Sequence, residues 1–256
     1  MIEIRQFPAR DDNYGVLVHD TTSGATASID APEEDAILDA LEETGWRLTD
    51  IFVTHHHYDH VEAVKALKER FGVRVVASAY DTQKGRVPEV DRAVVDGDHL
   101  FLGSTRVDVL AVPGHTLGHV AYHLPTAHAL FAGDTLFALG CGRLFEGTAA
   151  EMWASLKTLR ALPGETMVHC GHEYTQANAR FALTIEPGNS ALARRAKEID
   201  GLRDQGLPTV PSRLADEIAT NPFLRADVAE VKLALGMAGA SDEAVFAEIR
   251  ERKNRF

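Results

Sequence analysis

The side chains best suited to chemistry are concentrated in one segment, His55-His56-His57-Tyr58-Asp59-His60. Because alternate residues of an extended chain point the same way, His55 and His57 can reach one metal ion. A helix is predicted to start near residue 60, where Asp59 and His60 can face a second ion. Imidazole and carboxylate together suit zinc, iron or manganese, and no cysteine lies nearby for a structural thiolate zinc site. The segment therefore predicts a metal centre.

Three more residues of metal-ligand type each follow an apolar strand and a glycine: His115, Asp134 and His172. Glycine at such a position lets the backbone turn sharply. A single histidine after a strand is more often a capping or surface residue, but seven ligand-type residues at four strand ends need a common cause. An α/β scaffold assembles a site in this way, from loops at one edge of its sheets. Two further histidines are candidates for groups that support the ligands, His119 and His123.

The elements that must position these residues are of two kinds. Up to His172, short apolar runs alternate with helical patterns, and Thr148–Glu151 is a capping box that predicts a helix start. Strands are predicted at 51–54, 74–78, 106–112, 119–124, 129–131 and 166–170. Residues 173–256 are rich in Ala, Leu, Arg and Glu at helical spacing and contain no convincing strand. We predict a mixed α/β metal-binding domain at 1–172 and a helical substrate-binding domain at 173–256, docked onto it.

Charge and composition argue against several classes of function. The net charge of −12 argues against nucleic acid as a partner, because phosphate backbones are bound by basic stripes. The N-terminus lacks the basic stretch and apolar core of a secretory signal, and no apolar run approaches the length of a membrane span. Two cysteines, Cys141 and Cys170, are more typical of packing residues and of a reducing compartment. We expect a cytoplasmic, monomeric protein that binds small molecules and has neither nucleic acid nor a membrane as a partner.

The segment Thr54–His60 resembles the signature of the metallo-β-lactamase superfamily, whose members share an αββα sandwich with a metal site at one edge of the two sheets. Within the superfamily the chain resembles the glyoxalase II (hydroxyacylglutathione hydrolase) family. The segments that carry this second resemblance are 113–116, 131–137, 140–148, 170–175 and 221–225. They extend into the helical tail, so the resemblance covers nearly the whole chain. It implies an α/β sandwich followed by a C-terminal helical domain.

The resemblance implies a site for two divalent metal ions, expected to be zinc, with iron or manganese as alternatives. One ion would be bound by His55, His57 and His115. The other would be bound by Asp59, His60 and His172, and Asp134 would bridge the two. Asp59 would also orient a metal-bridging hydroxide, since a two-metal site lowers the pKa of a shared water.

The resemblance also implies a substrate and a reaction. A hydroxide would attack the thioester carbonyl of an S-2-hydroxyacylglutathione, S-D-lactoylglutathione in the usual pathway, and release glutathione and D-lactate in methylglyoxal degradation. The residues implied for the glutathione part are Arg143, Tyr174, Arg250 and Lys253. Taken alone, the basic run 250–256 also fits a solvated helix end. Phe145 departs from the tyrosine of many family members, so one hydrogen bond to glutathione would be missing.

Other functions remain open from the sequence. A mononuclear iron persulfide dioxygenase, a lactonase, another thioesterase or a β-lactam hydrolase would use part of the same ligand set. The helical tail with its basic end favours the glutathione thioesterase over these. A non-catalytic metal-binding or RNA-processing module is disfavoured by the complete ligand set and by the net charge of −12.

Overall fold

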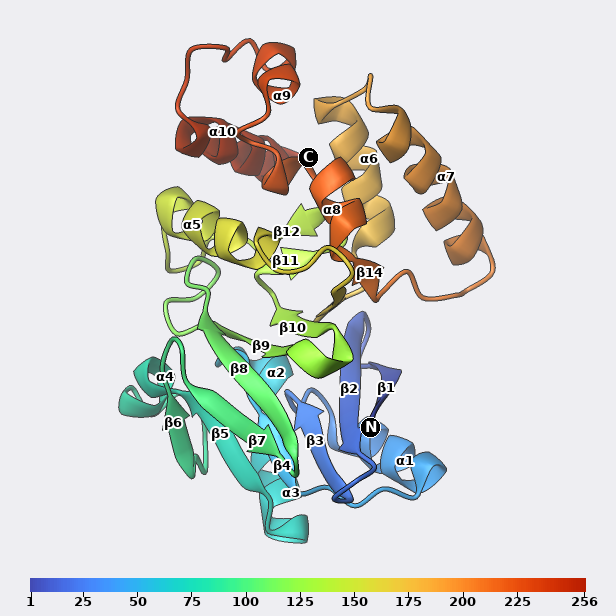
Figure 1. The fold of residues 1–256 in the computed structure, drawn as a ribbon, viewed down its shortest axis with the longest axis vertical. Coiled ribbons are helices and arrows are strands. Elements are labelled where there is room, and N and C mark those ends of the chain that lie inside the picture. The colour runs from blue at the N-terminus through green and yellow to red at the C-terminus, as the bar shows by residue number, and fades with distance from the viewer. The chain divides into compact units, whose positions relative to one another are not determined.

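The chain is divided between two units in the computed structural model, which describes all residues from 1 to 256 (Figure 1). Unit 1 consists of Met1–Ala111 and Gly118–Gly133, and unit 2 consists of Val112–Leu117 and Asp134–Phe256. The short segment Val112–Leu117 therefore belongs to unit 2, although the chain on both sides of it belongs to unit 1. None of the helices in either unit is both long and apolar enough to cross a membrane.

The first sheet of unit 1 has the strand order β1-β2-β3-β4-β5-β6. Its strands are β1 (Ile2–Ala9), β2 (Asn13–Asp20), β3 (Ala25–Ile29), β4 (Asp50–Phe52), β5 (Arg74–Ser78) and β6 (Arg92–Val94). The first three pair antiparallel, and β3 to β6 pair parallel. The helices between them are α1 (Glu34–Thr44), α2 (Tyr58–Val61), α3 (Val64–Phe71) and α4 (Ala79–Gln83). Ile37 of α1 and Leu67 of α3 are buried in one apolar cluster with Ile51 and Val75 of the sheet, so these helices cover one face.

The second sheet of unit 1 is antiparallel, in the order β10-β9-β8-β7. Its strands are β7 (His99–Leu102), β8 (Thr105–Ala111), β9 (Val120–Leu124) and β10 (Ala129–Gly133), with the turn η1 (Pro125–Ala127) between the last two. Val109 and Tyr122 are buried in a second apolar cluster with Phe52 and Val76 of the first sheet. Unit 1 is thus layered as helices, sheet and sheet.

Unit 2 contains the remaining helices and two short antiparallel strand pairs (Figure 1). Its strands are β11 (Leu136–Phe137), β12 (Gly140–Cys141), β13 (Met167–Cys170) and β14 (Ser212–Arg213). Its helices are α5 (Ala149–Arg160), α6 (Thr175–Ile185), α7 (Ser190–Asp204), α8 (Leu214–Thr220), η2 (Pro222–Leu224), α9 (Ala229–Ala234) and α10 (Asp242–Arg255). α6 and α7 lie side by side around the buried Ala182 and Leu192. The Trp153 ring of α5 stacks on Phe246 of α10 at 5.9 Å.

The predicted strands are present with shifted ends, and the predicted capping box begins α5 through reciprocal bonds between Thr148 and Glu151. Two expectations were wrong. The single helix expected from about residue 60 is two helices, α2 and α3, interrupted at Glu62-Ala63. A strand does occur after residue 172: β14 pairs with β13, and its two residues are too few to show a period in the sequence.

Candidate metal centre and substrate pocket

Unit 1 fixes the ring of His55 through a chain of hydrogen bonds. The Thr54 hydroxyl donates to Asp30 Oδ2 at 2.8 Å, because a carboxylate can only accept. The Thr54 oxygen, 3.1 Å from His55 Nδ1, therefore accepts from the Nδ1–H. This tautomer leaves a lone pair on His55 Nε2, which lies 3.1 Å from Nδ1 of His57. The predicted support by His119 agrees with its ring, which stacks on His55 at 4.7 Å.

His60 is oriented in the same way. Its Nδ1 lies 2.8 Å from Asp30 Oδ2 and donates to it, which leaves a lone pair on Nε2. That Nε2 lies 3.5 Å from Asp59 Oδ2, which in turn accepts from Asn13 Nδ2 at 3.0 Å. A ring nitrogen without a proton and a carboxylate oxygen thus face each other. A cation placed between them would convert this repulsive contact into coordination.

Asp30 is a functional residue that the sequence analysis missed. It directly follows the buried strand β3 and has a φ of 58°. Besides its bonds to Thr54 Oγ1 and His60, it accepts from the Thr54 N–H at 2.6 Å. The signal was available, because Asp30 is an acid directly after an apolar strand, like Asp134. By contrast, His123 lies on β9 opposite Asp108 rather than against the ligand-type residues.

Unit 2 brings His115, Asp134 and His172 together. His115 Nδ1 lies 2.9 Å from the carbonyl oxygen of Arg143 and donates to it, so its Nε2 carries the lone pair. This Nε2 and the Nε2 of His172 lie 3.5 and 3.3 Å from the same oxygen, Asp134 Oδ2. The loop passes so closely that a Cβ on Gly142 would lie 2.0 Å from the Asp134 carbonyl oxygen and 2.9 Å from His115 Nδ1. Only glycine fits there.

The chemistry of both donor sets fits divalent metal ions. Imidazole nitrogens and carboxylate oxygens converge in each unit, and in each unit the tautomer directs a lone pair toward a carboxylate. Neither cysteine offers a thiolate, because burial raises the pKa of Cys141 to about 11 and that of Cys170 to about 12. Both thiols are free and buried. The donors present are those of zinc, iron or manganese sites.

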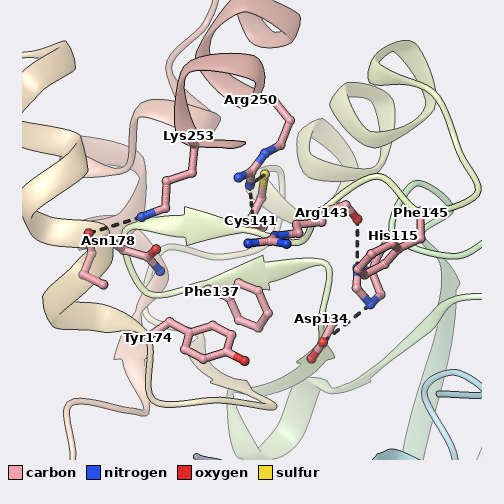
Figure 2. A pocket seen from close by; sticks show the side chains of 11 residues that line it. His115, Asp134, Phe137, Cys141, Arg143, Phe145, Tyr174, Asn178, Arg250 and Lys253 are labelled. Atoms are coloured by element: carbon pink, nitrogen blue, oxygen red, sulfur yellow. Dashed lines mark hydrogen bonds and ion pairs between the residues drawn. The ribbon is translucent and has the colours of Figure 1, made fainter. Parts of the chain in front are cut away.

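A cavity of about 510 Å³ in unit 2 opens beside His115 and Asp134. Figure 2 shows Arg250 and Lys253 reaching into it from α10, with Arg143 beside them and the rings of Phe137 and Tyr174 below. The residues that line it are His115, Asp134, Phe137, Cys141, Arg143, Phe145, Tyr174, Ala177, Asn178, Arg250 and Lys253. The Tyr174 ring lies nearly parallel to that of His172, with the ring centres 4.8 Å apart. The pocket therefore has ligand-type residues at one end and cations at the other.

The four residues predicted to bind substrate all line this pocket, but they differ in burial and in their hydrogen bonds to other protein groups. Arg250 is 4% exposed, and its Nη1 donates to the Cys141 carbonyl oxygen at 2.8 Å. Lys253 donates to the Ala177 carbonyl oxygen at 3.2 Å. Burial, and then the neighbouring Arg250, Arg180 and Arg143 cations, lower the pKa of Lys253 to about 8. These two side chains are not a fully solvated helix end.

Other pocket residues were not predicted. Asn178 lies one helical turn after Tyr174 on α6, so the two share a helix face, and this i, i+4 spacing was the available signal. Phe137 and Cys141 come from β11 and β12, which are too short to recognise. Phe145 is 62% exposed, and its ring meets that of His115 edge-on at 5.2 Å. Phe145 thus supplies an apolar wall beside His115.

Two family models together match nearly the whole chain. A model of the metallo-beta-lactamase superfamily matches residues 10–172, and a model of the hydroxyacylglutathione hydrolase C-terminus matches residues 173–256. A hydroxyacylglutathione hydrolase of Brucella anthropi is 58% identical over 255 residues, which are 100% of this chain and 97% of that protein. One of Brucella ovis is 56% identical over 255 residues, 100% of this chain and 98% of that protein.

A solved structure has a similar fold. ETHE1 from Myxococcus xanthus superposes with a TM-score of 0.71 at 28% sequence identity, covering 98% of this chain and 91% of that one. The predicted fold class is confirmed: a mixed α/β metallo-β-lactamase fold followed by a C-terminal helical region. The chain belongs to the hydroxyacylglutathione hydrolase family of the metallo-β-lactamase superfamily.

Proposed function

We propose that the protein hydrolyses S-D-lactoylglutathione to glutathione and D-lactate, as a metal-dependent thioester hydrolase in methylglyoxal degradation. The observation that carries the proposal is the polarity of the pocket in Figure 2, with His115 and Asp134 at one end and Arg250 and Lys253 at the other. Glutathione has two carboxylates, and a protein of net charge −12 needs a local cluster of cations to hold them. The relatives at 56–58% identity bear the name of this activity.

We infer that two divalent metal ions, zinc by preference and iron or manganese as alternatives, are bound by seven side chains of this chain. The ligands proposed are His55, His57, Asp59, His60, His115, Asp134 and His172, with Asp134 as the bridge. The support is the lone-pair orientation of the rings within each unit and the nitrogen and oxygen donors described above. Ions bound there would lower the pKa of a bound water and would act as a Lewis acid on the thioester carbonyl.

The protein's own groups act around that chemistry. Asp59 is proposed to accept a hydrogen bond from the attacking water and orient it, while Asn13 holds the Asp59 carboxylate from the other side at 3.0 Å. The leaving group is a thiolate whose pKa is about 8.5, so its departure needs no general acid. The proposed reaction therefore requires no side chain that protonates the sulfur atom.

The glutathione half is proposed to lie against Arg143, Tyr174, Arg250 and Lys253. Arg143 and Lys253 offer charge to its carboxylates, and Tyr174 offers a ring face and a hydroxyl. Arg250 is mostly engaged with the Cys141 carbonyl, so its contribution is proposed to be shared between substrate and the pocket wall.

We further propose domains at 1–172 and 173–256, supported by the ranges of the two family models. We also propose that the protein acts as a monomer. A cytoplasmic location, without nucleic acid or membrane as a partner, is supported by the two free thiols and the net charge of −12.

The function is tested by thiol release from S-D-lactoylglutathione beside a thioester of a short thiol that lacks the glutathione peptide. We expect a kcat/KM at least tenfold higher for the glutathione thioester, together with close to two metal ions per chain by elemental analysis. Equal kcat/KM for the two thioesters would refute glutathione specificity. Oxygen consumption with glutathione persulfide is the matched assay for the dioxygenase alternative, which the relatives' name does not favour.

A further inference from the structure

The hairpin of β11 and β12 forms part of the pocket wall, because Phe137 and Cys141 line the cavity. Its turn contains Leu139, whose φ is 56°. A residue with a Cβ is unfavourable in this left-handed conformation. The turn therefore keeps its shape only if neighbouring groups hold it.

Two buried side chains from elsewhere in unit 2 hold this turn. Glu217 of α8 is fully buried, and its Oε2 accepts from the Leu139 N–H at 2.8 Å. Asn221 is also fully buried, and its Nδ2 donates to the carbonyl oxygens of Phe137 at 3.1 Å and Gly140 at 3.0 Å. The same Nδ2 lies 3.1 Å from Glu217 Oε2, so the two side chains act as one clamp. Arg195 pairs with the other Glu217 oxygen and balances its charge.

The clamp is linked to the opposite side of the hairpin. Asn221 Oδ1 accepts from the Phe223 N–H at 3.0 Å and so begins η2. The guanidinium of Arg250 lies over the Phe223 ring at 5.1 Å and donates to the Cys141 carbonyl oxygen. The segment after α8 thereby fixes both the hairpin and the cation that reaches into the pocket.

We propose that Glu217 and Asn221 are positioning residues that set the affinity for the glutathione half of the substrate, an inference that rests on the proposed function. Neither lines the cavity, so neither touches the substrate. They act through Phe137, Cys141 and the Arg143 that follows. Asp134 is anchored separately, since the next residue, Thr135, donates to the Val112 carbonyl oxygen at 3.3 Å. Loosening the clamp therefore weakens binding more than it slows the chemical step.

The test uses Asn221→Ser, because serine retains the cap on the Phe223 N–H but is too short to reach the hairpin carbonyls. Asn189→Ser is a matched control: Asn189 also caps a helix of unit 2, accepting from the Leu192 N–H at 3.1 Å and donating to the Ala219 carbonyl oxygen at 3.0 Å. We expect Asn221→Ser to raise KM for S-D-lactoylglutathione about tenfold, with kcat within about twofold and metal content unchanged. KM for a short thioester should not change, and the Leu139 amide should exchange its hydrogen faster. The control should leave both KM values unchanged.

An unchanged KM in folded, metal-loaded Asn221→Ser overturns the inference, and so does a loss of kcat without a rise in KM. If Asn221→Ser does not fold, Asn221→Asp is measured in its place by the same criteria, because aspartate keeps the size of the side chain and the cap on the Phe223 N–H but removes the amide donor to the hairpin carbonyls. A wild-type protein that releases no thiol refutes the proposed function instead. In that case the inference is tested by calorimetry, which measures the affinity of wild type and variant for S-methylglutathione. A weaker affinity of the variant supports the inference, and an equal affinity overturns it.

Discussion

At the scale of single residues, the site depends on which nitrogen of each imidazole bears the proton. Asp30 decides this for two rings of unit 1, directly for His60 and through the Thr54 hydroxyl for His55. Arg143 does the same for His115 with its backbone carbonyl. Groups behind the proposed ligands thus fix the tautomer of each ring before any ion binds.

Asp30→Ala tests this preparation. Without the carboxylate, His60 and Thr54 lose their acceptor and both rings can adopt the wrong tautomer. We expect metal affinity to fall by about 10- to 100-fold, in the range found for groups behind metal ligands. The measurement is metal retention in a titration against a chelator of known affinity. Asp20→Ala is the control, because Asp20 is also a buried carboxylate of unit 1 but binds Ser23 and Ser104. Equal retention in both variants would contradict the role of Asp30.

We expect Lys253 to make substrate binding depend on pH. Its pKa is lowered to about 8, chiefly by burial, so the ammonium is present below that pH and is lost as the pH rises through it. We expect kcat/KM for the glutathione thioester to be higher below pH 8 and to fall above it, since this ratio reports groups of the free enzyme. Lys253→Arg, whose guanidinium stays charged, should remove this fall. A wild-type profile with no step near pH 8 would show that Lys253 does not bind the substrate as a cation.

At the scale of elements, the loop after β12 must pass the metal-ligand residues at van der Waals distance. Gly142→Ala would place a methyl group 2.0 Å from the Asp134 carbonyl oxygen, and backbone atoms cannot move aside cheaply. We expect at least a 100-fold loss of kcat and a lower metal content. Gly164→Ala is the control, because its added Cβ would meet only the Ala215 side chain at 3.4 Å. Normal turnover in Gly142→Ala would mean that this close approach does not matter for activity.

The elements also show where prediction from sequence succeeds. The apolar strands β5, β8 and β9 could be predicted because their own residues determine them, and the capping box determines the start of α5. The hairpin of β11 and β12 was not found, because a bond to Glu217, 78 positions away from Leu139, holds its turn. The ligand-type residues could be recognised by their chemical type alone. The position of Asp30 after an apolar strand marked it as a candidate, but only the folded chain shows that Asp30 contacts Thr54 and His60 and that Asn221 contacts the hairpin.

At the scale of the whole molecule, the proposed metal ions bear on the stability of the fold. Ions that bind only the folded protein stabilise it by RT ln(1 + [M]/Kd), which is about 4 kcal/mol at 1,000 times Kd. Removal of metal with a chelator should therefore lower the melting temperature by several degrees, and added zinc should restore it. Calorimetry of the metal-free and reloaded protein measures this. Identical melting temperatures would argue that the ions contribute nothing to the stability of the fold.

The segment Val112–Leu117 bears on how the chain can be divided. It belongs to unit 2 because its backbone pairs with the loop 30 residues later, through bonds such as that from Phe145 N–H to the His115 carbonyl oxygen at 3.2 Å. No single cut of the polypeptide therefore separates the two units, and the helical tail is not a portable module. An engineer who exchanges that tail between relatives has to exchange Val112–Leu117 and the stretch from Asp134 onward with it, as one discontinuous graft.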